Sequence, residues 1–211
     1  MSCQKGILLV ISGPSGSGKG TVIKRLLEKR DDFVYSVSAT TREPRAGERD
    51  GVNYYFISRE EFEGRIEAEM MLEFAEYCGN YYGTPKKEVY ERLTEGQNVI
   101  LEIEVKGAMQ IREKCPDAVL LMIAPPDFTT LESRLRGRGD NVPEEVILRR
   151  LETARYELSQ LPKYDYIVIN GNDQVEDAVD RIIAVANAEK SRVTRSADFF
   201  EHFFSCESGT R

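Results

Sequence analysis

The sequence has one histidine, and its four cysteines are scattered along the chain. Cys3, Cys78, Cys115 and Cys206 form neither a CxxC pair nor a spacing typical of metal ligands. We therefore expect reduced thiols and no metal site built from protein side chains. His202 lies near the C-terminal end, outside any catalytic pattern, so chemistry that depends on a histidine base is not expected.

Long hydrophobic runs and an excess of basic residues are also missing. The longest apolar runs, such as residues 119–124, are far shorter than the ~20 residues that span a membrane. With 29 Lys and Arg against 36 Asp and Glu, the formal charge is −7, which disfavours nonspecific binding to nucleic acid or anionic lipid. The apolar stretch at residues 6–11 is too short for a signal peptide, so a cytoplasmic location is expected.

What is present is an alternation of short apolar runs and helical patterns. Continuous apolar runs of this length are typical of parallel strands that are covered by helices on both faces. Amphipathic stripes at residues 22–27 and 175–186 predict helices that pack on such a sheet. The sequence therefore predicts an α/β fold. The apolar runs lie at residues 7–11, 99–103, 119–124 and 167–169.

Two segments interrupt this alternation. Residues 38–83 contain paired aromatics and a stretch of alternating polarity, which predict a small β-rich insertion with one helix near residues 60–69. Residues 134–155 form a second insertion that is dense in arginine. In that insertion Pro143 is expected to open a helix that runs to about residue 161, because proline suits the first helical turn.

A further helix is predicted between the first insertion and the strand at residue 99. Thr84 is interpreted as its N-cap and Pro85 as its first helical residue. Gly96 is expected to terminate this helix.

A glycine-rich loop follows the first predicted strand directly and precedes the first predicted helix. Its GxxxxGK pattern in this strand–loop–helix context predicts a phosphate-binding loop. The backbone amides, the helix N-terminus and the Lys19 ammonium group are expected to cradle the β-phosphate of a nucleoside triphosphate. The residues expected to bind this nucleotide are Gly13, Pro14, Ser15, Gly16, Ser17, Gly18, Lys19, Gly20 and Thr21.

The loop departs from the general pattern at one position. A Ser or Thr that binds magnesium usually follows the lysine, whereas here Gly20 follows Lys19 and Thr21 comes next. The Gly-Lys-Gly-Thr sequence resembles that of nucleoside monophosphate kinases. The resemblance implies that Mg²⁺ is held mainly through phosphates and water, with Thr21 near the α-phosphate.

The loop alone is compatible with GTPases, ATPases and kinases. The sequence contains neither Asn-Lys-x-Asp nor Asp-x-x-Gly, the segments with which a regulatory GTPase would read guanine and sense the γ-phosphate. The acceptor of the phosphoryl group is therefore sought in the two insertions.

The first insertion contains a specific set of motifs. Residues 38–56 read SATTREPRAGERDGVNYYF, and the set continues with Glu73, GNYYGT at 79–84, EIEVKG at 102–107 and RLRGRG at 134–139. Together these motifs resemble guanylate kinase over about residues 5–188. The resemblance implies a P-loop kinase core with a five-stranded parallel sheet flanked by helices, a β-rich GMP-binding insertion and a helical, arginine-rich lid. It also implies two small-molecule substrates, GMP and ATP.

The basic residues of the first insertion suit a phosphate group. Arg42 and Arg45 flank a proline-stiffened turn and can present forked donors to a phosphate, and Tyr54 can add a hydroxyl donor. The resemblance implies that these three residues hold the phosphate of GMP, with Tyr82 also in the substrate site. A solvated turn remains the alternative for either arginine taken alone.

Recognition of guanine requires an acceptor for its N1–H and N2–H₂ donors, where adenine presents an acceptor at N1. Glu73 is the expected carboxylate, and the hydroxyls of Thr84 and Ser38 are its expected partners at the base. A hydrogen-bonding site of this kind can favour the matching base over the wrong one by a factor of roughly 10⁴–10⁵ in kcat/KM. Glu104 stands where the family often has Asp, so its carboxylate is expected near guanine with a shifted contact.

The second insertion is expected to close over the transferring phosphoryl group. By resemblance Lys19, Arg42, Arg134, Arg138 and Arg150 are the catalytic residues, whereas Arg136 and Arg149 are expected to face solvent or to pair with carboxylates. Phosphoryl transfer needs positioning and charge neutralisation, and the phosphate nucleophile of GMP needs no general base. The glycines beside Arg138 supply backbone freedom for closure.

These expectations define one domain and a tail. A guanylate kinase-like domain is expected over residues 1–189, followed by a tail at 190–211. Its core comprises 1–37, 97–126 and 162–189, its GMP-binding insertion 38–96 and its lid 127–161. Two alternatives stay open, namely a non-catalytic interaction module related to this family and a kinase for another nucleoside monophosphate. The oligomeric state is not predicted.

Overall fold

A computed structural model describes residues 5–137 and 142–195. Its main sheet has five parallel strands in the order β2-β7-β1-β8-β9. The predicted apolar runs correspond to four of these strands, with bounds that agree to within one residue. The fifth, β2, has no such run because it is only three residues long. The strands are β1 (Leu8–Ser12), β2 (Phe33–Tyr35), β7 (Asn98–Glu102), β8 (Val119–Ala124) and β9 (Tyr166–Ile169).

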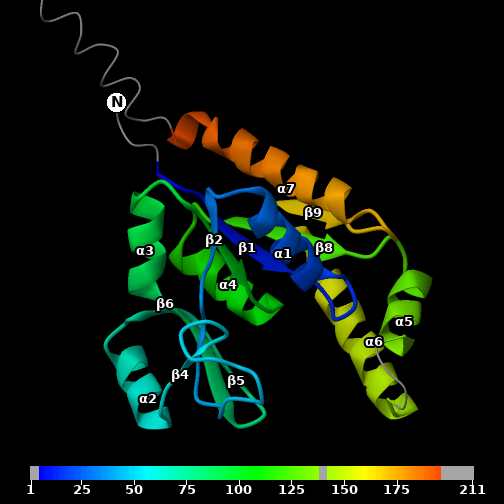
Figure 1. The fold of residues 1–211 in the computed structure, drawn as a ribbon, viewed down its shortest axis with the longest axis horizontal. Coiled ribbons are helices and arrows are strands. Elements are labelled where there is room, and N and C mark those ends of the chain that lie inside the picture. The colour runs from blue at the N-terminus through cyan, green and yellow to red at the C-terminus, as the bar shows by residue number, and fades with distance from the viewer. Residues whose placement is uncertain (1–4, 138–141, 196–211) are drawn as a thin grey trace, which may run out of the picture.

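Helices cover both faces of the main sheet (Figure 1). Leu9 and Ile11 of β1 lie in one buried cluster with the apolar sides of α1 and α7, and Leu8 and Val10 lie in the opposite cluster with α3 and α4. Because side chains alternate along a strand, a central strand covered on both faces must be apolar throughout. The helices are α1 (Lys19–Lys29), α3 (Lys86–Thr94), α4 (Val105–Lys114) and α7 (Val175–Lys190).

A second sheet forms the first insertion, with the strand order β4-β3-β6-β5. The helix α2 (Arg59–Glu67) packs on it through Phe62, whose ring stacks on that of Tyr81 with centroids 5.2 Å apart. Ser58 caps α2 by accepting a hydrogen bond from the amide of Glu61. The strands are β3 (Ala39–Thr40), β4 (Tyr55–Phe56), β5 (Met71–Tyr77) and β6 (Asn80–Pro85).

The prediction that Thr84 caps α3 is wrong. Thr84 lies inside β6, opposite Glu73 of β5, and its hydroxyl bonds to the Glu73 carboxylate instead of to a helix amide. Pro85 is the N-cap, and α3 begins one residue later. The hydroxyl bonds to the buried carboxylate in preference to a helix amide, because hydrogen bonds to charged groups stabilise more than bonds between neutral groups.

The second insertion contains α5 (Phe128–Arg136) and α6 (Glu144–Ser159), joined by their own small apolar cluster. Pro143 is the N-cap of α6 and not its first residue, and the helix ends two residues earlier than predicted, before the 3₁₀ turn η1 (Leu161–Lys163). Figure 1 shows that this insertion and the β-rich insertion project from the same end of the main sheet.

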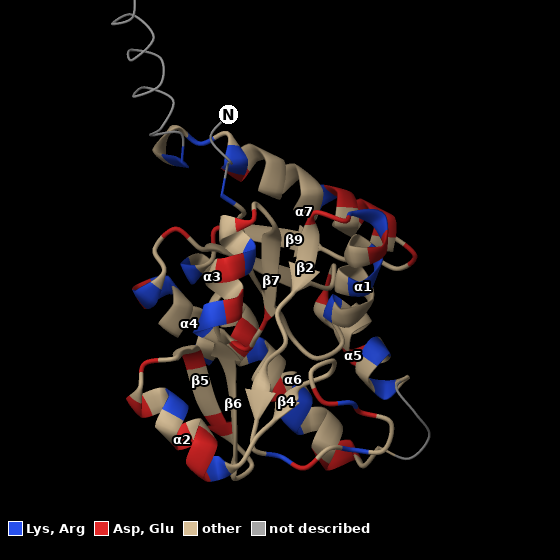
Figure 2. Ribbon diagram, turned by 60° about the vertical axis from the view of Figure 1, so that its left-hand side comes forward, with Lys and Arg blue, Asp and Glu red and all other residues tan. Residues whose placement is uncertain are grey.

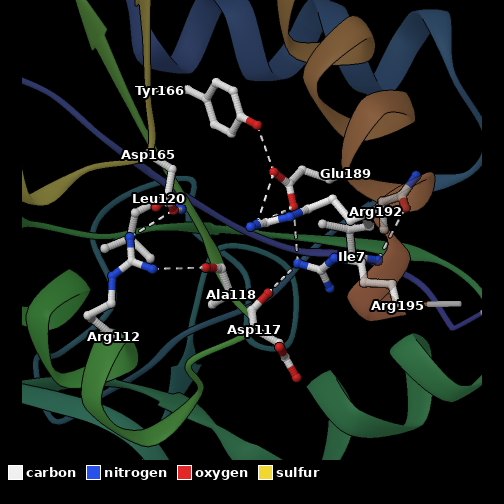
Figure 3. Close-up of polar contacts among 11 residues, drawn as sticks. Ile7, Arg112, Asp117, Ala118, Leu120, Asp165, Tyr166, Glu189, Arg192 and Arg195 are labelled. Carbon is white, nitrogen blue, oxygen red and sulfur yellow. Dashed lines mark hydrogen bonds and ion pairs between the residues drawn. The ribbon is translucent and has the colours of Figure 1, made fainter. Parts of the chain in front are cut away.

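The end of α7 is tied to the opposite end of the sheet by a polar cluster (Figure 3). Glu189 is almost fully buried and accepts hydrogen bonds from the hydroxyl of Tyr166 at 2.7 Å and from Arg192 at 3.2 Å. Arg195, in the 3₁₀ turn η2 (Val193–Arg195), contacts Glu189 at 3.4 Å and the carbonyl of Asp117.

Acidic and basic residues are interspersed along the outer helices (Figure 2). Within the described ranges, no helix is long and apolar enough to cross a membrane. Cys3, Cys206 and His202 lie outside the described residues. Cys78 and Cys115 are free thiols.

Candidate functional site

The glycine-rich loop connects the carboxyl end of β1 to the N-terminus of α1. Gly18 is the N-cap of α1 with φ +84°, and a Cβ at this position would lie 2.3 Å from Nδ2 of Asn170. Only glycine fits this backbone and this close approach. No side chain caps α1, so the first amides of the helix have no acceptor within it and point into the loop.

Two polar side chains of the loop, Lys19 and Ser17, differ in their hydrogen bonding. The ammonium of Lys19 donates to the carbonyl of Gly13. The hydroxyl of Ser17 is buried and has no hydrogen-bond partner among the described residues. An orphaned buried hydroxyl, a lysine folded over the loop and the N-terminus of a helix together suit an incoming phosphate.

A cleft of about 620 Å³ opens beside this loop, between α5 and the segment that joins β9 to α7. Its floor is the loop, and its far wall comes from residues that sequence reasoning did not select, Asn170 above all. The residues that line it are Gly16, Gly18, Thr21, Arg134, Gly137, Asn170, Gly171, Asn172, Asp173 and Val175.

Asn170 joins the wall of the cleft to the loop. Its Nδ2 donates to the carbonyl of Ser17 at 2.8 Å, and its Oδ1 is buried without a described partner. One signal could have found it, because Asn170 follows β9 directly and polar residues at the carboxyl ends of parallel strands line ligand sites.

Arg134 crosses the same cleft from α5. Its Nη2 donates to the carbonyl of Asn170 at 3.0 Å and to Oδ1 of Asn172 at 2.9 Å, and its Nη1 lies 3.5 Å from the carbonyl of Gly16. The guanidinium therefore lies against both walls of the cleft. Arg136 points elsewhere and pairs with Glu132 and Glu144, which confirms the expectation that it pairs with carboxylates.

Two further arginines, Arg150 and Arg138, were predicted in the lid. Arg150 is half-buried on α6. Arg138 lies outside the described residues.

Glu73 is the most buried acidic group of the β-rich insertion, at 4% exposure. The hydroxyl of Thr84 donates to its Oε1 at 2.7 Å. A Cβ on Gly107 of α4 would lie 2.6 Å from its Oε2, so glycine is needed for the carboxylate to approach α4. Burial raises the pKa of Glu73, although the Thr84 hydrogen bond and the positive charge of Lys114 oppose the rise.

The remaining base-site candidates flank this pair. Glu104 is the N-cap of α4 and is exposed, and its negative charge adds to the rise in the pKa of Glu73. Ser38 is half-buried just before β3, and its carbonyl accepts a hydrogen bond from the amide of Tyr55.

The phosphate-site candidates lie on or beside the neighbouring strands β3, β4 and β6. The guanidinium of Arg42 lies 5.6 Å from the ring centroid of Tyr54, and the rings of Tyr54 and Tyr82 meet edge to face at 6.0 Å. Burial tends to lower the pKa of Arg42, but hydrogen bonds with Glu48 and Tyr82 outweigh this effect, so the pKa is raised overall. Arg45 is exposed on the same turn. The structure thus brings Arg42, Tyr54 and Tyr82 together.

Glu157 is a site residue that sequence reasoning missed. It is half-buried near the end of α6, and no described residue hydrogen-bonds to its carboxylate. Burial raises the pKa of Glu157 to about 7, the charge of Lys19 lowers it and the charge of Glu104 raises it. This carboxylate therefore lies within electrostatic reach of both the glycine-rich loop and Glu104 at the start of α4.

Residues 5–137 and 142–195 contain no group of three His, Cys, Asp or Glu side chains that could hold a metal ion. Gly20 supplies no side-chain oxygen, and the space where its Cβ would lie is open. Thr21 lines the cleft and is the nearest loop hydroxyl beyond Lys19.

Comparisons with known proteins agree with this geometry. The family model described as guanylate kinase matches residues 5–189. A guanylate kinase of Clostridium perfringens (strain SM101 / Type A) is 53% identical over 91% of this chain and 88% of its own length. A guanylate kinase of Halalkalibacterium halodurans is 49% identical over 98% of this chain and 100% of its own length.

Solved structures give the same result. The crystal structure of guanylate kinase from Anaplasma phagocytophilum matches with a TM-score of 0.72 and 34% identity, over 91% of this chain and 90% of that one. The resemblance seen in the motifs is confirmed, and so is the α/β fold with a five-stranded parallel sheet. The chain belongs to the guanylate kinase family.

Proposed function

We propose that this protein transfers the γ-phosphoryl group of ATP to GMP, giving ADP and GDP. The observation that carries the proposal is the buried Glu73–Thr84 pair, which belongs to an insertion that projects from the same end of the main sheet as the phosphate loop. A phosphate loop alone serves many reactions. A buried carboxylate with a fixed orientation adds a second site that selects a base with hydrogen-bond donors.

The guanine base is assigned to Glu73. Its carboxylate accepts from N1–H and N2–H₂ of guanine, with Thr84, Ser38 and Glu104 as further polar partners. Adenine presents an acceptor at N1, so it would leave the buried carboxylate facing a lone pair. The GMP phosphate is assigned to Arg42, Arg45, Tyr54 and Tyr82, where guanidinium forks and hydroxyls suit a dianion.

ATP is assigned to the loop at residues 13–21 and the cleft beside it. The helix amides and Lys19 hold the phosphates, and the cleft that Arg134 and Asn170 line receives the nucleoside part. Mg²⁺ fits this site only as an ion held mainly by phosphates and water, since Gly20 offers no oxygen and Thr21 has one hydroxyl. When bound, it would neutralise charge on the transferring phosphates.

Transfer then depends on positioning and charge. The attacking phosphate oxygen of GMP is already anionic near neutral pH, so no protein base is needed. Lys19, Arg42, Arg134, Arg138 and Arg150 are assigned to stabilise the charge that spreads over the transferring group. Closure of the two insertions would exclude water, which is the competing acceptor. The cytoplasmic location stays a prediction.

Release of ADP with GMP, with AMP and with no acceptor tests the proposal. In the presence of ATP, we expect rapid release of ADP only when GMP is the acceptor. Lys19→Ala should abolish it, whereas Lys24→Ala, a change of an exposed lysine on the same helix, should leave it intact. Equal rates with AMP would point to a different monophosphate kinase. Absence of any GMP-dependent release would point to an interaction module.

A further inference from the structure

The turn that carries Arg42 and Arg45 is closed by a carboxylate that no part of the reaction scheme uses. Nη2 of Arg42 donates to Oε1 of Glu48 at 3.0 Å, and the backbone amide of Arg45 donates to Oε2 at 2.8 Å. Nη2 of Arg42 also lies 3.0 Å from Oε2, so the carboxylate of Glu48 contacts both of the arginines assigned to the GMP phosphate.

The contact with Arg42 is sheltered. The side chains of Arg42 and Glu48 are only 15% and 19% exposed. The guanidinium also donates from Nη1 to the carbonyl of Glu43 at 2.6 Å, and it lies over the rings of Tyr54 and Phe56 with centroids at 5.6 and 5.8 Å. Its position is therefore set by these two rings, the Tyr82 hydroxyl, one carbonyl and one carboxylate.

Two roles for Glu48 are conceivable, and they have opposite consequences. As an anion that merely occupies the phosphate site, Glu48 would compete with GMP, and its removal would strengthen GMP binding. As a brace, it would hold the guanidinium and the turn in place, and its removal would weaken GMP binding. Both of its bonds lie within its own turn, and one goes to a backbone amide that shapes that turn. These contacts favour the brace.

We propose that Glu48 is a positioning residue that presets Arg42 and the turn at residues 42–48 for the phosphate of GMP. This inference rests on the proposed function, because it concerns the affinity for GMP. A preset arginine loses less side-chain entropy when substrate binds, so the brace lowers the KM for GMP.

Steady-state kinetics of Glu48→Gln test the proposal. The amide keeps only one acceptor oxygen and loses the negative charge, so it cannot maintain all the contacts that Glu48 makes with Arg42 and the Arg45 amide. Loss of a charge-assisted hydrogen bond predicts that the KM for GMP rises about tenfold or more, while the KM for ATP changes less than about twofold. Glu48→Asp keeps both oxygens and should recover part of the loss. Glu43→Gln, an exposed change on the same turn, is the matched control.

A double mutant shows whether Glu48 acts through Arg42. In an Arg42→Ala background, Glu48→Gln should change the KM for GMP less than about twofold, because coupled residues are not additive. An unchanged or lowered KM for GMP in the folded single variant overturns the proposal, and so does full additivity. Thermal unfolding of each variant identifies any that fails to fold. Failure of the proposed function would appear separately, as wild-type protein without GMP-dependent ADP release.

Discussion

The hydroxyl of Thr84 and Oε1 of Glu73 lie 2.7 Å apart on neighbouring strands of the β-rich sheet. The hydrogen bond fixes one oxygen of the carboxylate, and the absence of a side chain on Gly107 leaves room for the other beside α4. The carboxylate is therefore oriented before any base arrives. Such preorganisation is what allows a hydrogen-bonding pocket to discriminate between bases.

Glu73→Gln should remove the recognition of guanine. The amide presents two N–H groups where the carboxylate presents only acceptors, so donors of guanine would meet donors of the protein. We expect kcat/KM for GMP to fall by about 10⁴-fold, with the KM for ATP nearly unchanged. Thr84→Val, which removes only the orienting hydroxyl, should lower kcat/KM for GMP about tenfold. The coupled ADP assay measures both, and a Glu73→Gln variant as active as wild type would refute the assignment.

Arg134→Ala should impair ATP use. The change removes the guanidinium that touches the carbonyls of Gly16 and Asn170 and the amide of Asn172. We expect the KM for ATP to rise by about 10- to 100-fold, since hydrogen bonds to a charged group contribute about 1.5–3 kcal/mol each. Arg136→Ala is the matched control two residues away, where an exposed ion pair should matter little. Equal effects of the two changes would count against the assigned role of Arg134.

Much of the core was predictable because its signals are local. The runs that became β1, β7, β8 and β9 are apolar except for Glu102, and helices packed on both faces of the sheet favour this pattern. The glycine-rich loop was predictable for the same reason, since it combines a turn, a charge and a helix start within nine residues.

What the sequence did not reveal depends on contacts between distant segments. Asn170 supports the loop from 153 residues away, and nothing beside it in the chain indicates this. Thr84 has the local pattern of a helix cap, yet its partner Glu73 comes from the neighbouring strand. Glu157 lies in an ordinary amphipathic helix, and only the packing of α6 brings its carboxylate near Lys19.

Glu157 should make stability depend on pH near neutrality. Its carboxyl titrates near 4.5 as a free group and near 7 in the folded protein, because burial disfavours the charge. Between these values the unfolded chain releases the proton and the folded protein retains it. Folding stability is therefore lost as pH rises from about 4.5 to about 7, and the loss is constant above that.

Glu157→Gln removes this dependence. Because solvent screens a half-buried group in part, we expect the variant to gain about 2–4 °C in Tm relative to wild type between pH 4.5 and pH 8. Glu152→Gln, at an exposed position of the same helix, should give a Tm difference that stays nearly constant. Thermal unfolding across this range measures both. A Tm difference for Glu157→Gln that is flat with pH would contradict the prediction.

Glu189→Ala should lower stability without affecting catalysis. The change leaves the Tyr166 hydroxyl and the guanidinium groups of Arg192 and Arg195 without their common acceptor, in a place where the Glu189 side chain is 3% exposed. The side chain of Arg192 is 59% exposed and that of Arg195 19%, so the expected loss is below that of a fully buried pair, at about 1.5–3 kcal/mol. Glu176→Ala, which breaks only exposed pairs, should leave the free energy of unfolding nearly unchanged. Urea unfolding gives both values.

Distance and pH separate this role from a catalytic one. Val175 lines the cleft at the start of α7, whose 16 residues span about 24 Å at 1.5 Å each before the helix ends beside Glu189. Both KM values should therefore stay within about twofold of wild type.

Burial tends to raise the pKa of Glu189, but Tyr166 and Arg192 outweigh it and lower the pKa below its usual 4.5. Its stabilising effect is accordingly present above pH 4.5 and is lost as pH falls further, so the gap between wild type and Glu189→Ala should narrow in acid. A gap that widens in acid would show that the carboxylate is not held in its charged form.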